Sequence, residues 1–294
     1  MHRKDFIRFS ISGGTVMTSL SAFNKFTSEL GEQEYGMPVL FIGHGSPMNG
    51  IEDNDFSRQW TNAVKDMPTP AAVLVVSAHW FTNGTKVTAM DAPPTIHDFG
   101  GFPKALFDVQ YPAPGSPILA KETAELLKPV TAVELNHDWG LDHGTWTVIR
   151  HMYPDAKIPV LQLSIDYTKG PQYHYDLAKE LYALRKKGVL IVGSGNMVHN
   201  LRMVAWDKMD VPGFGFDWAL ELNEDFKKFI AEGDHKALIQ YEKLGRKAQL
   251  AIPTPEHYLP LMYTLGLKGS KDAVSFFNDK AVAGSLTMTS VRLG

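Results

Sequence analysis

The chain has 294 residues, of which 44% are hydrophobic, 11% aromatic and 21% charged. These are the proportions of an ordinary globular protein, and the length is sufficient for one large hydrophobic core or two small ones. A formal net charge of -3 leaves no basic excess for binding a nucleic-acid backbone, so we expect no nucleic-acid partner. The absence of cysteine excludes disulfides, thiolate nucleophiles and cysteine-ligated metal sites, so any metal must be held by His, Asp or Glu.

The first 35 residues differ from the rest of the chain. Arg3 and Lys4 precede a mildly apolar stretch rich in Ser, Thr and Gly, which resembles a twin-arginine export signal with Lys4 in place of the second arginine. The alternative is a disordered N-terminal tail of a cytosolic protein. We therefore expect a periplasmic protein if the segment is a functional signal and a cytoplasmic protein otherwise. No stretch reaches the ~18 consecutive apolar residues of a membrane span, so no stable membrane association is expected.

From residue 36 onward the pattern predicts a single α/β catalytic domain, residues 36–294. Short apolar runs bounded by Gly, Pro or Asn predict buried strands, and apolar residues at spacings of three and four predict helices that end at Gly188 and Gly233. Strands alternating with helices predict a mostly parallel central sheet with helices on both faces. The expected strands are MPVLFIG (37–43), AAVLVVSA (71–78), TKVTAM (85–90), IPVLQLSI (158–165) and VLIVGSG (189–195), and the expected helices are SPILAKETAELLKPV (116–130), HYDLAKELYALRKKG (174–188) and FDWALELNEDFKKFIAEGD (216–234).

Four histidines lie just past these apolar runs or at a predicted helix start. The carboxyl ends of strands in an open α/β sheet meet at one crevice, and imidazole is the commonest metal ligand, so the pattern predicts a metal site. His44 and His79 follow predicted strands and are expected to be ligands. His199 is a further ligand or a general acid/base. His257 is placed in the first turn of a helix that begins at PTPE, where Glu256 competes with it for the ligand role.

Two further histidines have a context that suits a supporting or substrate-binding role. His97 and His143 each neighbour an aspartate in a glycine-containing loop. Other catalytic templates fit poorly, because the sequence has no G-x-S-x-G, no G-x-x-x-x-G-K-[ST], no H-E-x-x-H and no G-x-G-x-x-G after a strand. Four apolar side chains lie close in sequence to the candidate histidines. They are expected either to form an apolar wall of the site or simply to pack in the core: Met48, Trp80, Phe99 and Phe102.

Eight motifs in register over residues 38–294 resemble a known family. They are LFIGHGSPMN, VVSAHWF, PPTIHDFGGFP, YPAPGSP, DHGTW, LSID, GSGNMVHNL and PTPEHYLPL. On these motifs the chain resembles the DODA-type (LigB-like) extradiol aromatic ring-opening dioxygenases, and specifically the 4,5-DOPA dioxygenase group.

The resemblance implies an enzyme that uses O2 at a non-haem metal centre to open a DOPA-like catechol ring beside its two hydroxyls. Carried over by motif, His44, His79 and His257 correspond to metal ligands. His199 corresponds to the histidine that acts as an additional ligand or as the acid/base. His143 would flank the substrate.

We expect one divalent metal per chain, Zn2+ or Fe2+. Iron suits a reaction with O2 because it is redox-active, whereas an all-histidine site also suits zinc. The expected partners are a small catechol and O2. Two alternatives stay open on the residues alone: a zinc-dependent hydrolase, and a non-enzymatic metal-binding relative of the same fold.

Overall fold

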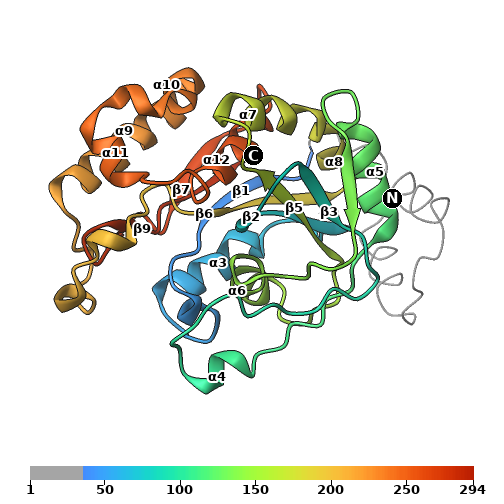
Figure 1. The fold of residues 1–294 in the computed structure, drawn as a ribbon, viewed down its shortest axis with the longest axis horizontal. Helices are drawn as coiled ribbons and strands as arrows, with labels where there is room; N and C mark the ends of the chain where they lie inside the picture. The colour runs from blue at the N-terminus through green and yellow to red at the C-terminus, as the bar shows by residue number, and fades with distance from the viewer. Residues whose placement is uncertain (1–35) are drawn as a thin grey trace.

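The computed structural model describes residues 36–294, so the signal-like segment 1–35 lies outside the described residues. Within the described part, eight strands form one sheet in the order β4-β3-β5-β2-β6-β1-β10-β7, and β8 pairs with β9 beside it (Figure 1). The strands are β1 (Val39–Gly43), β2 (Ala72–Thr82), β3 (Thr85–Thr88), β4 (Val133–Asn136), β5 (Val160–Asp166), β6 (Val189–Gly195), β7 (Val274–Phe277), β8 (Ala281–Val282), β9 (Leu286–Thr287) and β10 (Ser290–Leu293).

The centre of the sheet is parallel, as predicted. β5, β2, β6 and β1 pair with one another in parallel register, and all five predicted strands are present. The flanks depart from this pattern, because β3 pairs antiparallel to β5 and β10 pairs antiparallel to β1. Only residues 83–84 separate β2 from β3, and a connection this short reverses the chain, whereas a parallel return needs a crossover of about a dozen residues.

Both faces of the sheet are covered, which confirms the layered arrangement expected from the sequence. Along β1 the side chains alternate: Val39 and Phe41 enter one buried core, while Leu40 and Ile42 enter the other. α5, α7 and α12 contribute to the first core, and α3 and α6 to the second, on the opposite face of the sheet (Figure 1). The helices are α3 (Asp55–Lys65), α4 (Lys104–Phe107), α5 (Pro117–Leu127), α6 (His143–Met152), α7 (Pro171–Glu180), α8 (Tyr182–Lys186), α9 (Asp217–Glu232), α10 (His235–Ile239), α11 (Arg246–Ala251) and α12 (Leu259–Gly266).

The predicted helix at PTPE begins later than expected. His257 lies in a turn, and α12 starts at Leu259. The backbone N–H groups of Tyr258 and Leu259 both bond to the carbonyl of Pro255, and the carbonyl of His257 accepts the N–H of Asn196 at 2.9 Å. The placement of His257 in a first helical turn was therefore wrong, because its carbonyl bonds to the end of β6 instead of to a helix.

His143 also differs from its predicted context. It is the first residue of α6 and does not lie in a loop, because Asp142 caps the helix by accepting the N–H of Thr145. In the part of the chain that the structure describes, no helix combines the length and the apolar character needed to cross a membrane.

Candidate metal centre

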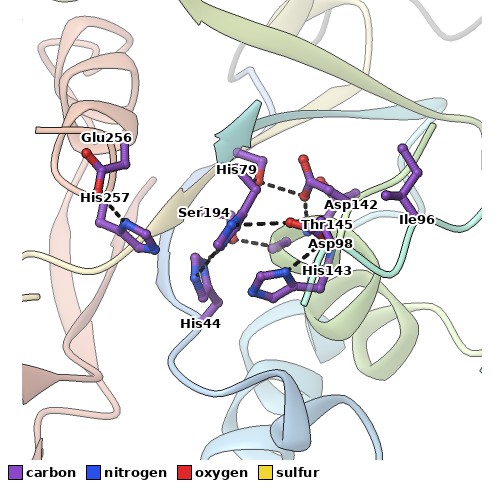
Figure 2. Close-up of polar contacts among 12 residues, drawn as sticks. His44, His79, Ile96, Asp98, Asp142, His143, Thr145, Ser194, Glu256 and His257 are labelled. Carbon is purple, nitrogen blue, oxygen red and sulfur yellow. Dashed lines mark hydrogen bonds and ion pairs between the residues drawn. The ribbon is translucent and has the colours of Figure 1, made fainter. Parts of the chain in front are cut away.

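Five histidines from distant parts of the sequence meet where the central parallel strands end. Figure 2 shows four of them: His44, His79, His143 and His257. His44 follows β1 directly, and its ring centroid lies 5.0 Å from that of His79, near the end of β2, and 5.3 Å from that of His257. The centroids of His79 and His257 are 5.1 Å apart. His143 lies 3.8 Å from His79, and His199 lies 3.6 Å from His257.

The nitrogen and oxygen atoms that could hold a metal fall into two neighbouring groups, in each of which they lie within 4.8 Å of one another. His44, His79 and His143 form the first group. His199, Glu256 and His257 form the second. The four histidines predicted as ligands are thus brought into one region, divided between the two groups.

The hydrogen bonds of His44 define which of its ring nitrogens is protonated. Ser194, at the end of β6, donates its only hydroxyl proton to the carbonyl of Gly144 at 2.5 Å. Ser194 Oγ must then accept from Nδ1 of His44, which lies 3.0 Å away. Nε2 of His44 is therefore unprotonated, and it lies 3.2 Å from Nε2 of His79, which can donate a hydrogen bond to it. Two imidazole nitrogens this close can also bind one metal cation between them.

A carboxylate lies behind His79 and His143. Asp98 Oδ1 accepts the backbone N–H of His143 at 2.9 Å and lies 2.9 Å from its Nδ1, at an angle that does not make a hydrogen bond. Asp98 Oδ2 lies 3.3 Å from Nδ1 of His79. Burial alone would raise the pKa of Asp98, but its contacts with His143 outweigh burial and lower the pKa below the usual range. The carboxylate is therefore ionised.

A second carboxylate, Asp142, is fully buried beneath the site. It accepts hydrogen bonds from Ser77 Oγ at 2.7 Å, from Gln162 Nε2 at 2.6 Å and from the N–H of Thr145 at 3.1 Å. Burial, followed by the nearby charge of Asp98, raises the pKa of Asp142. These bonds join β2, β5 and the start of α6, so they fix the position of the histidines that β2 and α6 carry.

On the other side of the site, His257 and His199 stack with an interplanar angle of 8°. Nδ1 of His257 bonds to Oε1 of Glu256 at 3.3 Å, and the same oxygen accepts the hydroxyl of Thr254 at 2.8 Å (Figure 2). Contact with His257 outweighs the effect of burial and lowers the pKa of Glu256 to about 2. Because an ionised carboxylate only accepts, Nδ1 of His257 donates and its Nε2 is free.

Burial is the largest influence on the protonation of these histidines. It lowers the pKa of His44, His79 and His257, and it lowers the pKa of His199 to about 3. The rings are therefore neutral near pH 7, and neutral imidazole is the form that binds a metal.

The backbone near His257 approaches the sheet closely. A Cβ atom at Gly195 would collide with the carbonyl oxygen of His257, so a glycine is required at this end of β6. Gly45, after His44, has a φ of 61°, a left-handed conformation that glycine adopts readily.

The aromatic residues near the site have different surroundings. Phe99 lies 5.6 Å from His143, between ring centroids, and packs against Phe102. Trp80 is buried and stacks on Trp139 at 5.9 Å. His97 lies outside both groups, with Nε2 bonded to the carbonyl of Val109 at 3.0 Å. Of the residues proposed as an apolar wall, Phe99 faces a site histidine, whereas Trp80 is part of a buried stack.

Sequence reasoning missed the acceptors behind the histidines. Asp98 was considered only as the aspartate beside His97, and no role was assigned to Ser194. Asp142 carries a local signal, because aspartate is one of the residues preferred at a helix N-cap. Asp98 and Ser194 have no comparable signal.

Comparisons with known proteins identify the family of the chain. A family model described as the catalytic LigB subunit of aromatic ring-opening dioxygenase matches residues 38–293. The chain belongs to this family. It is 48% identical over 261 residues to the 4,5-DOPA dioxygenase extradiol of Escherichia coli (strain K12), with 88% of this chain and 95% of that protein covered.

More distant relatives and a solved structure support the same assignment. The 4,5-DOPA dioxygenase extradiol of Beta vulgaris is 33% identical over 268 residues, which cover 90% of this chain and 98% of that protein. A crystal structure of an uncharacterized Escherichia coli K12 protein superposes with a TM-score of 0.75 at 43% identity, and it covers 88% of this chain and all of that one. This LigB-family chain is an aromatic ring-opening dioxygenase, in line with the resemblance of its motifs.

Proposed function

We propose that the chain is an extradiol dioxygenase that opens the ring of a DOPA-like catechol with O2 at one divalent metal held by His44, His79 and His257. The observation that carries the proposal is the unprotonated Nε2 of His44, which lies 3.2 Å from Nε2 of His79 within a cluster of largely buried, neutral imidazoles. The relatives named 4,5-DOPA dioxygenase extradiol support the reaction and the substrate class.

His199 is better suited to proton transfer than to metal binding. An imidazole lone pair lies in the plane of its ring, and the rings of His199 and His257 are nearly parallel with centroids 3.6 Å apart. Their lone pairs therefore do not converge on one point. Glu256, which also competes for the ligand role, is engaged by His257 Nδ1 and by the hydroxyl of Thr254, so it supports His257 as the ligand.

When bound, a redox-active metal such as Fe2+ would pass electrons from the catechol to O2. The residues of the chain bind, orient and exchange protons. We assign the proton transfer to His199, whose neutral ring would accept a catechol hydroxyl proton and return it later. His143 and Phe99 lie side by side, with ring centroids 5.6 Å apart, and would contact the aromatic ring of the substrate. The buried carboxylates hold the imidazoles in place.

The test is anaerobic reconstitution of the protein with Fe2+ or with Zn2+, followed by L-DOPA and then air. We expect O2 uptake and a yellow ring-opened product with Fe2+ and none with Zn2+. Absence of turnover with DOPA and simpler catechols in the Fe2+ protein would refute the proposal. Turnover with Zn2+ alone, without O2 uptake, would favour the hydrolase alternative.

Histidine variants separate the assigned roles. We expect His44→Ala and His257→Ala to lose metal binding, and His199→Ala to retain the metal but lose turnover. His137, an exposed histidine outside the site, provides the matched control, and His137→Ala should behave as wild type. Loss of metal binding in His199→Ala would make this residue a ligand.

A further inference from the structure

A row of three polar side chains crosses the sheet beneath the start of α6. On this face β5, β2 and β6 bury valine and leucine in the core that they share with α3 and α6. Near the carboxyl ends of the strands, the next positions on the same face are polar: Gln162 on β5, Ser77 on β2 and Ser194 on β6. All three are 0% exposed, and Ser77 pairs directly with Ser194 across the ladder. Buried polar groups need hydrogen-bond partners, and this row finds its partners in α6.

Gln162 holds Asp142, the residue before α6, at two points. Its Oε1 accepts the backbone N–H of Asp142 at 2.7 Å, and its Nε2 donates to Asp142 Oδ2 at 2.6 Å. Because a backbone N–H can only donate, the amide of Gln162 has one possible orientation. The backbone N–H of Gln162 in turn donates to Thr88 Oγ1 of β3 at 2.9 Å. Two bonds to one residue fix both the position and the rotation of Asp142.

Asp142 and the polar row together hold the first turn of α6. Asp142 Oδ1 accepts the N–H of Thr145 at 3.1 Å and so caps the helix, whose first residue is His143. The carbonyl of Gly144, the next residue, accepts the hydroxyl of Ser194 at 2.5 Å. The start of α6 is therefore bonded to β5 on one side and to β6 on the other.

The same hydrogen bonds continue to two further histidines. Ser77 Oγ donates to Asp142 Oδ1 at 2.7 Å and accepts the backbone N–H of His79 at 3.2 Å. Ser194 Oγ lies 3.0 Å from Nδ1 of His44 (Figure 2). The path from Gln162 to His79 therefore runs through Asp142 and Ser77.

We infer that Gln162 is a positioning residue for the metal centre: by holding Asp142 it places the first turn of α6, which carries His143, and through Ser77 it sets where β2 presents His79. This inference rests on the proposed function for the metal. The placement of α6 on the sheet, however, is a property of the metal-free chain.

Gln162→Met is the informative substitution. Methionine is also long and unbranched, so it fills the same space, but it carries no amide. The N–H and Oδ2 of Asp142 then lose their buried partner. We expect Asp142 to turn toward other partners and to shift the start of α6 and the end of β2 with it.

Two control variants separate this effect from a general loss of stability. Gln59 is exposed on α3, so Gln59→Met makes the same chemical change without a buried contact. Asp272→Ala removes a buried ion pair with Arg185. Arg185 also bonds to the carbonyl of Met37, before β1, whereas His44 follows β1, so this pair lies at the opposite end of the strand from the site.

The first measurement is backbone hydrogen exchange of the metal-free protein by NMR. Thr145 and His79 have N–H groups that Gln162 does not contact, but that Asp142 and Ser77 hold. In Gln162→Met we expect both to exchange about 10-fold faster relative to the N–H groups of α5. Asp272→Ala should show no such local increase. Equal acceleration throughout Gln162→Met, or none at these two groups, would overturn the inference.

The second measurement is the affinity of the metal-free protein for Co2+, determined by competition with a chromophoric chelator, together with the visible absorption of the bound Co2+. We expect Gln162→Met to bind about 10–100-fold more weakly, the usual effect of removing a group that supports metal ligands, and its spectrum to change. Gln59→Met and Asp272→Ala should match the wild type in both. Wild-type affinity in a folded Gln162→Met variant would overturn the inference.

Ser77→Ala tests the path even if Gln162→Met does not fold. It removes only the hydroxyl that joins Asp142 to His79. We expect faster exchange at the N–H of His79 and weaker Co2+ binding, and unchanged Co2+ affinity would overturn the inference. Where both single variants fold, their losses of affinity should not multiply in the double variant, because the two residues act along one path. Fully multiplied losses would show that Gln162 does not act through Ser77.

These measurements distinguish the inference from the proposed function. If the wild type binds no metal or opens no catechol, the proposed function fails. The exchange pattern of the metal-free protein still decides whether Gln162 places the start of α6 and the end of β2.

Discussion

Gly144, the second residue of α6, offers a sharp test of how the scaffold holds His79. A Cβ at this position would lie 2.6 Å from Ser77 Oγ and 2.9 Å from His79 Cδ2. Carbon atoms pack comfortably at about 3.5 Å, so the imidazole must move by roughly half an ångström. Ser77 cannot retreat freely, because its hydroxyl bonds to Asp142 at 2.7 Å and accepts the N–H of His79 at 3.2 Å.

Two effects on stability oppose each other in Gly144→Ala. Alanine in place of glycine favours a helix by about 1 kcal/mol. Overpacking of a buried position costs about 1–3 kcal/mol. We therefore expect the free energy of unfolding in urea to fall by no more than about 2 kcal/mol, with the fold preserved.

The effect on the site should be larger than the effect on stability. Cδ2 adjoins Nε2 in the imidazole ring, so displacement of Cδ2 moves the metal-binding nitrogen with it. We expect the affinity for Co2+, measured by chelator competition, to fall about 10–100-fold. Gly100 provides the control, because a Cβ there meets nothing within 4 Å, and Gly100→Ala should match wild type. Wild-type affinity in Gly144→Ala would refute the reasoning.

Three further substitutions test other parts of the structure. Ser194→Ala leaves Nδ1 of His44 without its buried acceptor, so the free energy of unfolding in urea should fall by about 1–3 kcal/mol and Co2+ binding should weaken. An unchanged free energy and an unchanged Co2+ affinity would show that Ser194 does not hold His44. Burial lowers the pKa of His174 from 6.5 to about 4, so its neutral form contributes stability that is complete above pH 6.5 and is lost as the pH falls toward 4. The loss should reach about 3 kcal/mol in urea titrations, and His174→Gln should flatten that part of the pH dependence; an equal slope in both proteins would contradict the assignment. Asp272→Ala removes the partner at 2.7 Å from the buried guanidinium of Arg185 and should cost about 3 kcal/mol of unfolding free energy; a cost below about 1 kcal/mol would mean that the pair behaves as an exposed one.

The apolar runs allowed the parallel centre of the sheet to be predicted, because strands buried on both faces need continuous hydrophobic sequence. The helices α3 and α6 were harder to recognise. α3 (DFSRQWTNAVK) is mostly polar and buries only Ser57, Trp60 and Val64, while α6 begins with a histidine and a glycine and contains β-branched residues. Their packing against the sheet, which stabilises them, is not visible in local sequence.

The site, like the fold, could be predicted from the sequence only in part. Histidines at strand ends could be recognised one at a time, since each has an apolar strand before it. The groups that orient them could not, because Ser194 is 150 residues from His44 and Asp98 is 45 residues from His143. The start of α12 was misjudged for a similar reason, since the carbonyl of His257 is bound by the distant Asn196.

The position of β10 between β1 and β7 has a consequence for how the protein is made. Ser290 Oγ accepts the N–H of Gly43 at 3.0 Å, directly before His44, and β10 supplies the antiparallel partner of β1. A ribosome makes β1 early and residues 290–293 nearly 250 residues later. Until then, the outer edge of β1 in the nascent chain is unpaired and able to join foreign strands. His44 therefore gains this support only after the C-terminal strand has been made.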